Sequence, residues 1–146
     1  MTPDTDVALI RHLAECIRAV DYAGARPLFA EDLIGFGSLA DFVIGRDALE
    51  RDQWRRVWGA IDGTSFRLDE LRAIVSSDRL TAVGMVMFDS TGYHEDGTPY
   101  DRPGRSTVVF GREAPGESWI ARHVHFSVAP GVPARSFGSM PESLAP

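Results

Sequence analysis

The stretch that decides the fold is WIARHVHFSVAP, residues 119–130. Its aromatic and β-branched residues alternate with polar ones, which predicts a β-strand. Side chains alternate between the two faces of a strand. One face is predicted to carry Ile120, Arg122, Val124, Phe126 and Val128, and the other to carry Trp119, Ala121, His123, His125 and Ser127. An apolar face opposite an amphipathic one favours a curved sheet that packs helices on one side and a partner on the other.

The residues before this strand indicate helices first and strands later. A first helix, capped by Thr5 or Asp6, is predicted from the spacing of Ile10, Leu13, Ala14, Ile17 and Val20. A short helix over 22–29, a hairpin of 33–36 with 41–44, and a third helix from about Arg46 to Gly63 follow. Three long strands are then predicted over 66–76, 80–91 and 104–112. This order indicates an α+β domain with an antiparallel meander, and no glycine-rich phosphate loop follows any strand.

Length and composition restrict the class of protein. The 146 residues suit one domain, predicted over 1–130, followed by a flexible Pro, Gly and Ser-rich tail over 131–146. The net charge is −6, and the 15 basic residues are all arginines scattered along the chain, so we expect no nucleic-acid partner. No apolar run approaches the roughly 20 residues that span a membrane, and we expect a cytoplasmic protein.

Three motifs occur in an order that is found in a known superfamily. They are Gly45-Arg46-Asp47-Ala48-Leu49 at the third helix, Arg105-x-Thr107-x-Val109, and Trp119...His123-x-His125-x-Ser127-x-Ala129-Pro130. In this order they resemble the NTF2-like (cystatin-like) superfamily over about residues 5–130. The nearest groups are SnoaL-like domains, ketosteroid isomerase-like proteins and the association domain of calmodulin-dependent kinase II.

The resemblance implies a fold more than a function. It implies a cone of curved antiparallel sheet wrapped on N-terminal helices, a ligand cavity at the open end, and a homodimer across the outer sheet face. The same scaffold serves isomerases, cyclases, hydrolases and oligomerising hubs. The resemblance therefore leaves the activity open.

Two departures from the resembling groups predict an apolar cavity. The place of the isomerases' carboxylate base is occupied by Phe36, and the places of two kinase-domain arginines are occupied by Phe126 and Val108. Both changes replace charge with apolar surface, which suits a hydrophobic small molecule. The predicted ligand-binding residues are Phe36, Trp54, Trp58, Met85, Met87, Val108, Phe110 and Phe126.

If the protein catalyses a reaction, we expect acid–base chemistry without a cofactor. Arg122 and Tyr100 would orient or polarise a carbonyl group, and Asp41 or Asp89 would move the proton. Taken singly, these residues are more often solvated or turn residues. The function hypothesis is therefore a binder, or an isomerase, cyclase or hydrolase, acting on a hydrophobic compound.

Three alternatives remain open. The first is a non-catalytic association module that assembles through Trp119, His123 and His125. The second is a metal site on the two histidines, although no carboxylate follows at ligand spacing, so a structural role is favoured and no metal is predicted. The third concerns the loop over 92–104, which is either a solvated hairpin tip or a lid on the cavity.

Overall fold

The computed structural model describes residues 7–139, so the predicted cap at Thr5 or Asp6 lies outside the described residues. Helix α1 (Val7–Ala19) is amphipathic as predicted, except that Val20 is not part of the stripe: it follows the helix with a positive φ of 52° and is 39% exposed. Its apolar residues recur every three or four positions and are buried against the sheet, while the opposite face is exposed. The following turn leads into α2 (Tyr22–Ala25), whose N-cap Asp21 accepts a hydrogen bond from Gly24 N at 2.9 Å.

The second predicted helix ends earlier than expected. Pro27 lies in the 3₁₀ turn η1 (Arg26–Leu28), where its missing N–H is tolerated. Phe29 then begins β1 (Phe29–Phe36), which pairs with β2 (Phe42–Ile44) in the predicted hairpin. The helical prediction for residue 29 is wrong because this residue pairs with Ala121 in the sheet.

The third helix begins at Arg46, as predicted, after Gly45 adopts a positive φ of 95°. It runs without interruption through α3 (Arg46–Leu49), η2 (Glu50–Trp54), α4 (Arg55–Val57) and η3 (Trp58–Ala60). Segment η2 is a π-helical turn, a widening that is frequent at functional sites.

The strands differ from the prediction in two places. The segment over 66–76 is two strands, β3 (Asp62–Phe66) and β4 (Arg72–Val75), because the 3₁₀ turn η4 (Leu68–Glu70) interrupts it. A short strand, β6 (Pro99–Asp101), lies within the predicted loop and pairs with the end of β5 (Thr81–Tyr93). The last two strands are β7 (Gly104–Gly111) and β8 (Ile120–Val128).

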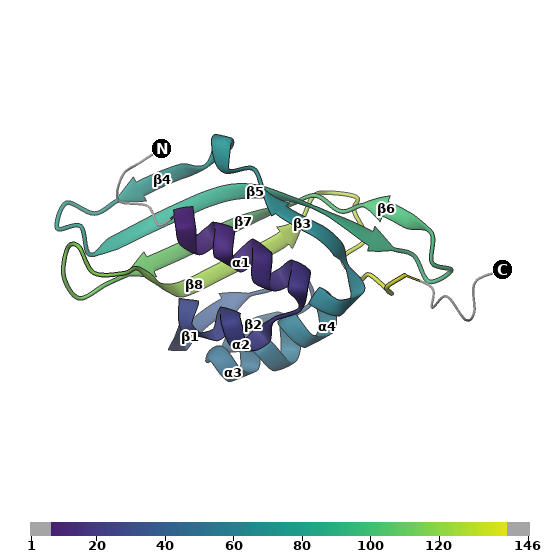
Figure 1. Ribbon diagram of the computed structural model, residues 1–146, viewed down its shortest axis with the longest axis horizontal. Coiled ribbons are helices and arrows are strands. Elements are labelled where there is room, and N and C mark those ends of the chain that lie inside the picture. Colours follow the sequence, from purple (N-terminus) through teal and green to yellow (C-terminus); the bar gives the residue numbers. More distant parts are fainter. Residues whose placement is uncertain (1–6, 140–146) are drawn as a thin grey trace.

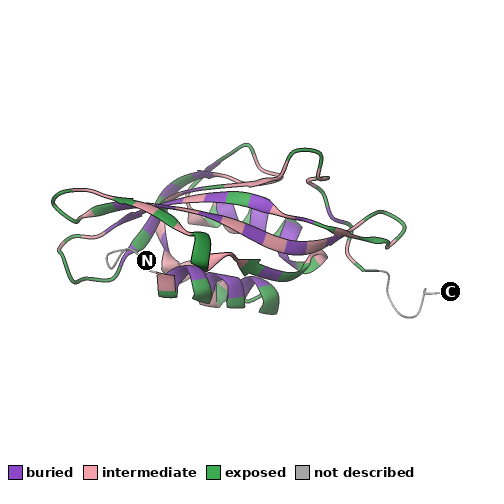
Figure 2. Cartoon of the chain, turned by 90° about the horizontal axis from the view of Figure 1, so that it is seen from above, coloured by how far each residue is buried: buried purple, intermediate pink, exposed green. Residues whose placement is uncertain are grey.

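The strands form one eight-stranded sheet in the order β2-β1-β8-β7-β5-β3, with β4 and β6 also paired to β5. Strand β8 is central, as predicted, between β7 and β1. Its pairing with β1 is parallel, so the sheet is mixed and not wholly antiparallel. The helices cover one face of this curved sheet (Figure 1), and buried and exposed residues alternate along its strands (Figure 2). The fold is the predicted α+β, NTF2-like cone.

The two faces of β8 are divided by a β-bulge that the sequence does not reveal. Val109 pairs with His123 but Phe110 pairs with Ala121, so Arg122 is an extra residue on β8. The predicted alternation of side chains between the two faces is therefore wrong for the residues of this strand before His123. Ala121 faces the core with Val124, and Arg122 points outward, where it forms an ion pair with Glu113 at 3.6 Å.

The segment after β8 makes defined contacts over residues 131–139. Ser136 is buried, accepts a hydrogen bond from Tyr93 N and donates one to Ala60 O. Tyr100 Oη donates to the carbonyls of Pro133 and Arg135 at 3.1 and 3.0 Å. These contacts join this part of the predicted tail to β5, β6 and η3. Over residues 7–139, no helix is long and apolar enough to cross a membrane.

Candidate functional site

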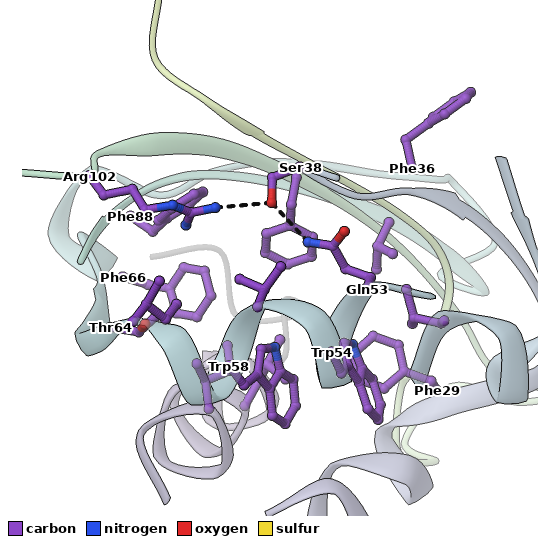
Figure 3. Close-up of a pocket in the computed structure, with 17 residues that line it drawn as sticks. Phe29, Phe36, Ser38, Gln53, Trp54, Trp58, Thr64, Phe66, Phe88 and Arg102 are labelled. Atoms are coloured by element: carbon purple, nitrogen blue, oxygen red, sulfur yellow. Dashed lines mark hydrogen bonds between the residues drawn. The ribbon is translucent and has the colours of Figure 1, made fainter. Parts of the chain in front are cut away.

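A cavity of about 50 Å³ lies between the helices and the inner face of the sheet. Such a volume holds roughly three to five water molecules, because each needs about 10–15 Å³. The lining side chains come from α1, from the third helix, from the sheet and from the loops between these elements (Figure 3). They are Leu13, Ile17, Phe29, Phe36, Ser38, Leu49, Gln53, Trp54, Val57, Trp58, Ile61, Thr64, Phe66, Phe88, Arg102, Val124 and Phe126.

Aromatic side chains account for seven of the 17 lining residues. Trp54 and Trp58 lie one turn apart and stack with their ring centres 4.7 Å apart. On the sheet side, the rings of Phe66, Phe88 and Phe126 lie 6.2–6.4 Å from one another. Rings at these separations favour flat apolar ligands over branched polar ones.

Arg102 is the one charged side chain among the lining residues that the structure describes. It follows β6, and its backbone is fixed on both sides by Ser90, which donates from Oγ to Arg102 O and accepts from Arg102 N. The side chain is only 2% exposed. Its Nη2 donates to Ser38 Oγ and to Ala134 O, both at 3.0 Å, and its Nε is buried with no acceptor among residues 7–139. Burial lowers the pKa of this guanidinium, since no carboxylate among residues 7–139 pairs with it.

Ser38 and Gln53 continue the polar end of the cavity. Gln53 lies in the π-helical turn, and its Oε1 accepts hydrogen bonds from Leu39 N at 3.1 Å and Ala40 N at 3.2 Å. Its Nε2 donates to Ser38 Oγ at 2.9 Å. The β1–β2 loop is therefore held against the helix, and Ser38 is held next to Arg102 (Figure 3).

Thr64 supplies another polar atom to the cavity lining. Its Oγ1 is buried and has no hydrogen-bond partner among the described residues. Arg18 fixes the strand at this point by donating to Thr64 O at 2.6 Å. A hydroxyl can donate one hydrogen bond and accept two, so Thr64 Oγ1 adds hydrogen-bonding capacity to the lining.

The predicted ligand-binding residues are only partly brought together. Trp54, Trp58, Phe126 and Phe36 line the cavity, although the Phe36 ring points away from it, against Phe42 and His125 (Figure 3). The other four are absent from the lining. Val108 and Phe110 are buried on the inner face but belong to the core, and Met85 and Met87 lie on the outer face.

None of the four residues predicted for acid–base work lines the cavity. Asp41 is exposed before β2, Tyr100 binds the 133–135 segment, and Arg122 points outward at the bulge. Asp89 forms a two-point ion pair with Arg67 at 2.8 and 2.9 Å. The hydrogen bond from Arg67 holds the pKa of Asp89 below its usual value, which makes this carboxylate a poorer proton acceptor.

The predicted partner face is also altered. Trp119 is buried, packs on Phe110 and lies under the Arg112 guanidinium at 3.9 Å, so it faces the core. His123 and His125 do face outward; Nδ1 of His123 lies 2.6 Å from Ile34 O. Among residues 7–139 there is no group of three or more His, Cys, Asp or Glu side chains that could hold a metal ion.

The predicted lid loop over 92–104 is largely a hairpin. Strands β5 and β6 pair up to Tyr93 and Pro99, which leaves a short exposed tip at 94–98. The end of this segment, at Arg102, nevertheless contributes to the cavity. Of the two expectations for this loop, the tip matches the solvated hairpin tip, and the residue that lines the cavity is the arginine next to β7.

Ser38, Gln53, Thr64 and Arg102 are the polar residues that sequence reasoning missed. Each occurs alone in its segment with no motif around it. The Gln53 position on the inward stripe of the third helix, one residue before Trp54, was the one available signal, since a polar residue on an apolar stripe needs a partner.

A helix-covered, curved mixed sheet, with a cavity in which Arg102 is the one charged lining residue among those described, defines an NTF2-like cone. The SnoaL-like domain family matches residues 7–131, and the chain therefore belongs to the SnoaL-like family. No curated protein matches the chain.

Solved structures with similar folds span different functions. An NTF2-like superfamily protein from Salmonella enterica is 19% identical, with a TM-score of 0.67 over 86% of this chain and 90% of its own. A ketosteroid isomerase-like protein from Erwinia carotovora is 15% identical, with a TM-score of 0.68 over 89% and 100%. The association domain of C. elegans CaMKII is 16% identical, with a TM-score of 0.61 over 83% and 91%. At these identities the likeness shows the fold alone.

Proposed function

We propose that this protein binds a small, mainly apolar molecule in the cavity, with Arg102 holding its polar end. The observation that carries the proposal is the guanidinium of Arg102, a residue that is 2% exposed, has no carboxylate partner among the described residues, and borders a mainly apolar cavity. Burying an uncompensated charge destabilises a fold. Such a group is retained more readily where a ligand restores the lost solvation.

The lining favours binding over acid–base catalysis. A proton transfer needs a group that can accept a proton at a pH near neutrality. Among the described lining residues Arg102 is the one titratable side chain, and a guanidinium stays protonated. The predicted proton acceptors Asp41 and Asp89 lie outside the cavity. The cavity therefore offers anchoring and electrostatic stabilisation, and an isomerase, cyclase or hydrolase would need a base from another source.

The size of the cavity limits the ligand body. A volume of about 50 Å³ favours a single ring or a short chain over a multi-ring compound. Toluene is a suitable probe because it has one ring and no polar group. We expect toluene, titrated into ¹⁵N-labelled protein, to shift the amide signals of the third helix and of β8 in a saturable way.

Filling the cavity should remove this binding. Val57 is buried and lines the cavity, so Val57→Phe places a ring in the space that toluene would use. Val83→Phe makes the same change on the outer face of β5 and serves as the control. The proposal is overturned if toluene causes no saturable shifts, or if both variants bind it as well as the original protein does.

A second candidate function, an association module, is favoured by the outer face of the sheet. One row of cross-strand partners there consists of Ile44, Ile34, His123, Val109, Val83 and Ile74. Phe42, Ile44 and Ile74 are 67%, 73% and 65% exposed. Contiguous apolar surface of this kind marks interaction sites. A homodimer would cover it, through His123 and His125 but not through the buried Trp119.

A charge on this face tests the second candidate. We expect Ile34→Glu, within the row, or His125→Glu, two residues along β8 from His123, to convert dimers into monomers, because a buried interface tolerates no unpaired carboxylate. Light scattering after size-exclusion chromatography measures the mass. An original protein that is monomeric at every concentration, or dimers that survive both changes, would refute an interface on this face.

A further inference from the structure

The hydrogen-bond geometry at the polar end of the cavity restricts the ligand further. The orientation of the Gln53 amide is fixed, because two backbone N–H groups, of Leu39 and Ala40, donate to its Oε1. Its Nε2 must then be the donor to Ser38 Oγ. Arg102 has donors only. Ser38 Oγ thus accepts two hydrogen bonds, one from Gln53 and one from Arg102.

Two accepted hydrogen bonds fill both lone pairs of a hydroxyl group. The Ser38 proton is therefore left to donate, and no acceptor for it occurs among residues 7–139. Accepting a bond from a cation also polarises the hydroxyl and strengthens it as a donor. Ser38 lines the cavity, so its O–H can meet a ligand there.

Arg102 adds a second free donor. Both hydrogens of its Nη2 are used, by Ser38 Oγ and Ala134 O, while Nε is buried and no described residue accepts from it. The side-chain acceptors at this end are occupied, since Gln53 Oε1 already receives two N–H groups. The polar end of the cavity therefore presents donors and a positive charge.

We infer that the ligand carries an anionic hydrogen-bond acceptor, of the carboxylate class, which binds Ser38 O–H and Arg102 while its apolar body lies among the aromatic rings. This inference rests on the proposed binding function and names the class of ligand. At this end of the cavity an amine head would meet a cation and a donor; Thr64 Oγ1, the one unpaired acceptor among the described lining side chains, makes no hydrogen bond with Ser38 or Arg102. An alcohol head could accept from Ser38 and Arg102, but its own proton would find no partner beside them.

A matched set of one-ring compounds tests the head group. Benzoate, benzyl alcohol and benzylamine share the ring of toluene and differ in one substituent, and their affinities can be measured by the same NMR titration. We expect benzoate to bind on the order of tenfold to a hundredfold more tightly than benzyl alcohol, the range for a hydrogen bond to a charged group. Benzylamine should bind most weakly.

Variants identify the residues responsible. Arg102→Gln removes the buried charge, so the ratio of benzoate affinity to benzyl alcohol affinity should fall to near one. The control Arg105→Gln removes a positive charge on the exposed side of β7 and should leave this ratio unchanged. Ser38→Ala should lower benzoate affinity, and Ser38→Thr, which keeps the hydroxyl, should restore it. Equal affinities for the three compounds, or a ratio that Arg102→Gln leaves intact, overturn the inference while toluene binding stands. If toluene also fails to bind, the proposed function falls with it.

Discussion

Gln53→Met tests whether the buried amide holds the β1–β2 loop in place. Gln53 is 7% exposed and makes three hydrogen bonds, to Leu39 N, Ala40 N and Ser38 Oγ. Methionine keeps the unbranched shape of glutamine, so packing against Gly37 is preserved and only polar contacts are lost. The substitution therefore isolates the value of the hydrogen bonds.

The expected loss is moderate. Three hydrogen bonds at about 1 kcal/mol each cost about 3 kcal/mol, and the more apolar side chain returns about 1 kcal/mol. The net destabilisation is about 2 kcal/mol. For a domain of this size, each kcal/mol lowers Tm by roughly 2–4 °C, so we expect a fall of about 4–8 °C. Scanning calorimetry and urea unfolding followed by tryptophan fluorescence measure it.

Gln53→Glu is the control. Its carboxylate still accepts from both backbone N–H groups, and Ser38 can rotate to donate to it, so most of the stability should remain. The carboxylate also places a negative charge one hydroxyl away from Arg102, which should abolish the preference for benzoate. The reasoning is refuted if Gln53→Met melts at or above the original Tm, or if Gln53→Glu is destabilised as much as Gln53→Met.

Three further outcomes are expected. Asp89→Asn should lower Tm at pH 7 and match the original protein at low pH. Arg67 depresses the pKa of Asp89 in the folded state below the roughly 3.9 of an unfolded Asp, so the stability that the ion pair contributes is present above about pH 3.9 and is lost as the pH falls through the folded pKa. A Tm difference that is the same at every pH would contradict this. Ser136→Ala should speed amide hydrogen exchange in the segment that carries it, because two hydrogen bonds to β5 and η3 are lost, and unchanged exchange would show that the other contacts suffice. Phe110→Ala should lower the free energy of unfolding in urea by about 3–5 kcal/mol, because Phe110 is buried in the core. Met85→Ala should lower it by less than about 1.5 kcal/mol, because Met85 lies on the outer face of the sheet, and equal losses would refute this assignment of faces.

The fold could be predicted where local patterns are sufficient by themselves. The stripe of α1 and the start of the third helix at Gly45-Arg46 depend on neighbouring residues alone, and both are confirmed. The faces of β8 depend on pairing with β7. One extra residue at Arg122 reverses every side chain before it, and no local pattern distinguishes a bulged strand from a regular one.

The candidate site could be predicted less well than the fold, for a different physical reason. Its polar end joins a loop, a helix and a second loop, with Ser38 separated from Gln53 by 15 positions and from Arg102 by 64. Each of these residues is ordinary in its own segment. The aromatic wall was easier to predict, because Trp54 and Trp58 carry helical spacing and large rings favour burial wherever they occur.

The position of the cation explains why a site could not be transferred from the resembling groups. By the resemblance to the kinase association domains, Val108 and Phe126 occupy the places of arginines; Val108 is packed among core side chains, where a charge would have no polar neighbour. The chain instead brings Arg102 in from the β6–β7 loop, where Ala134 O and Ser38 Oγ replace part of its hydration. Burying a cation destabilises the fold less at the end of the sheet, where loops supply carbonyl and hydroxyl oxygens, than along the middle of the sheet, where loops are absent. Ligand chemistry in this protein should therefore be sought from the loops inward, starting with the donors that the fold leaves unpaired.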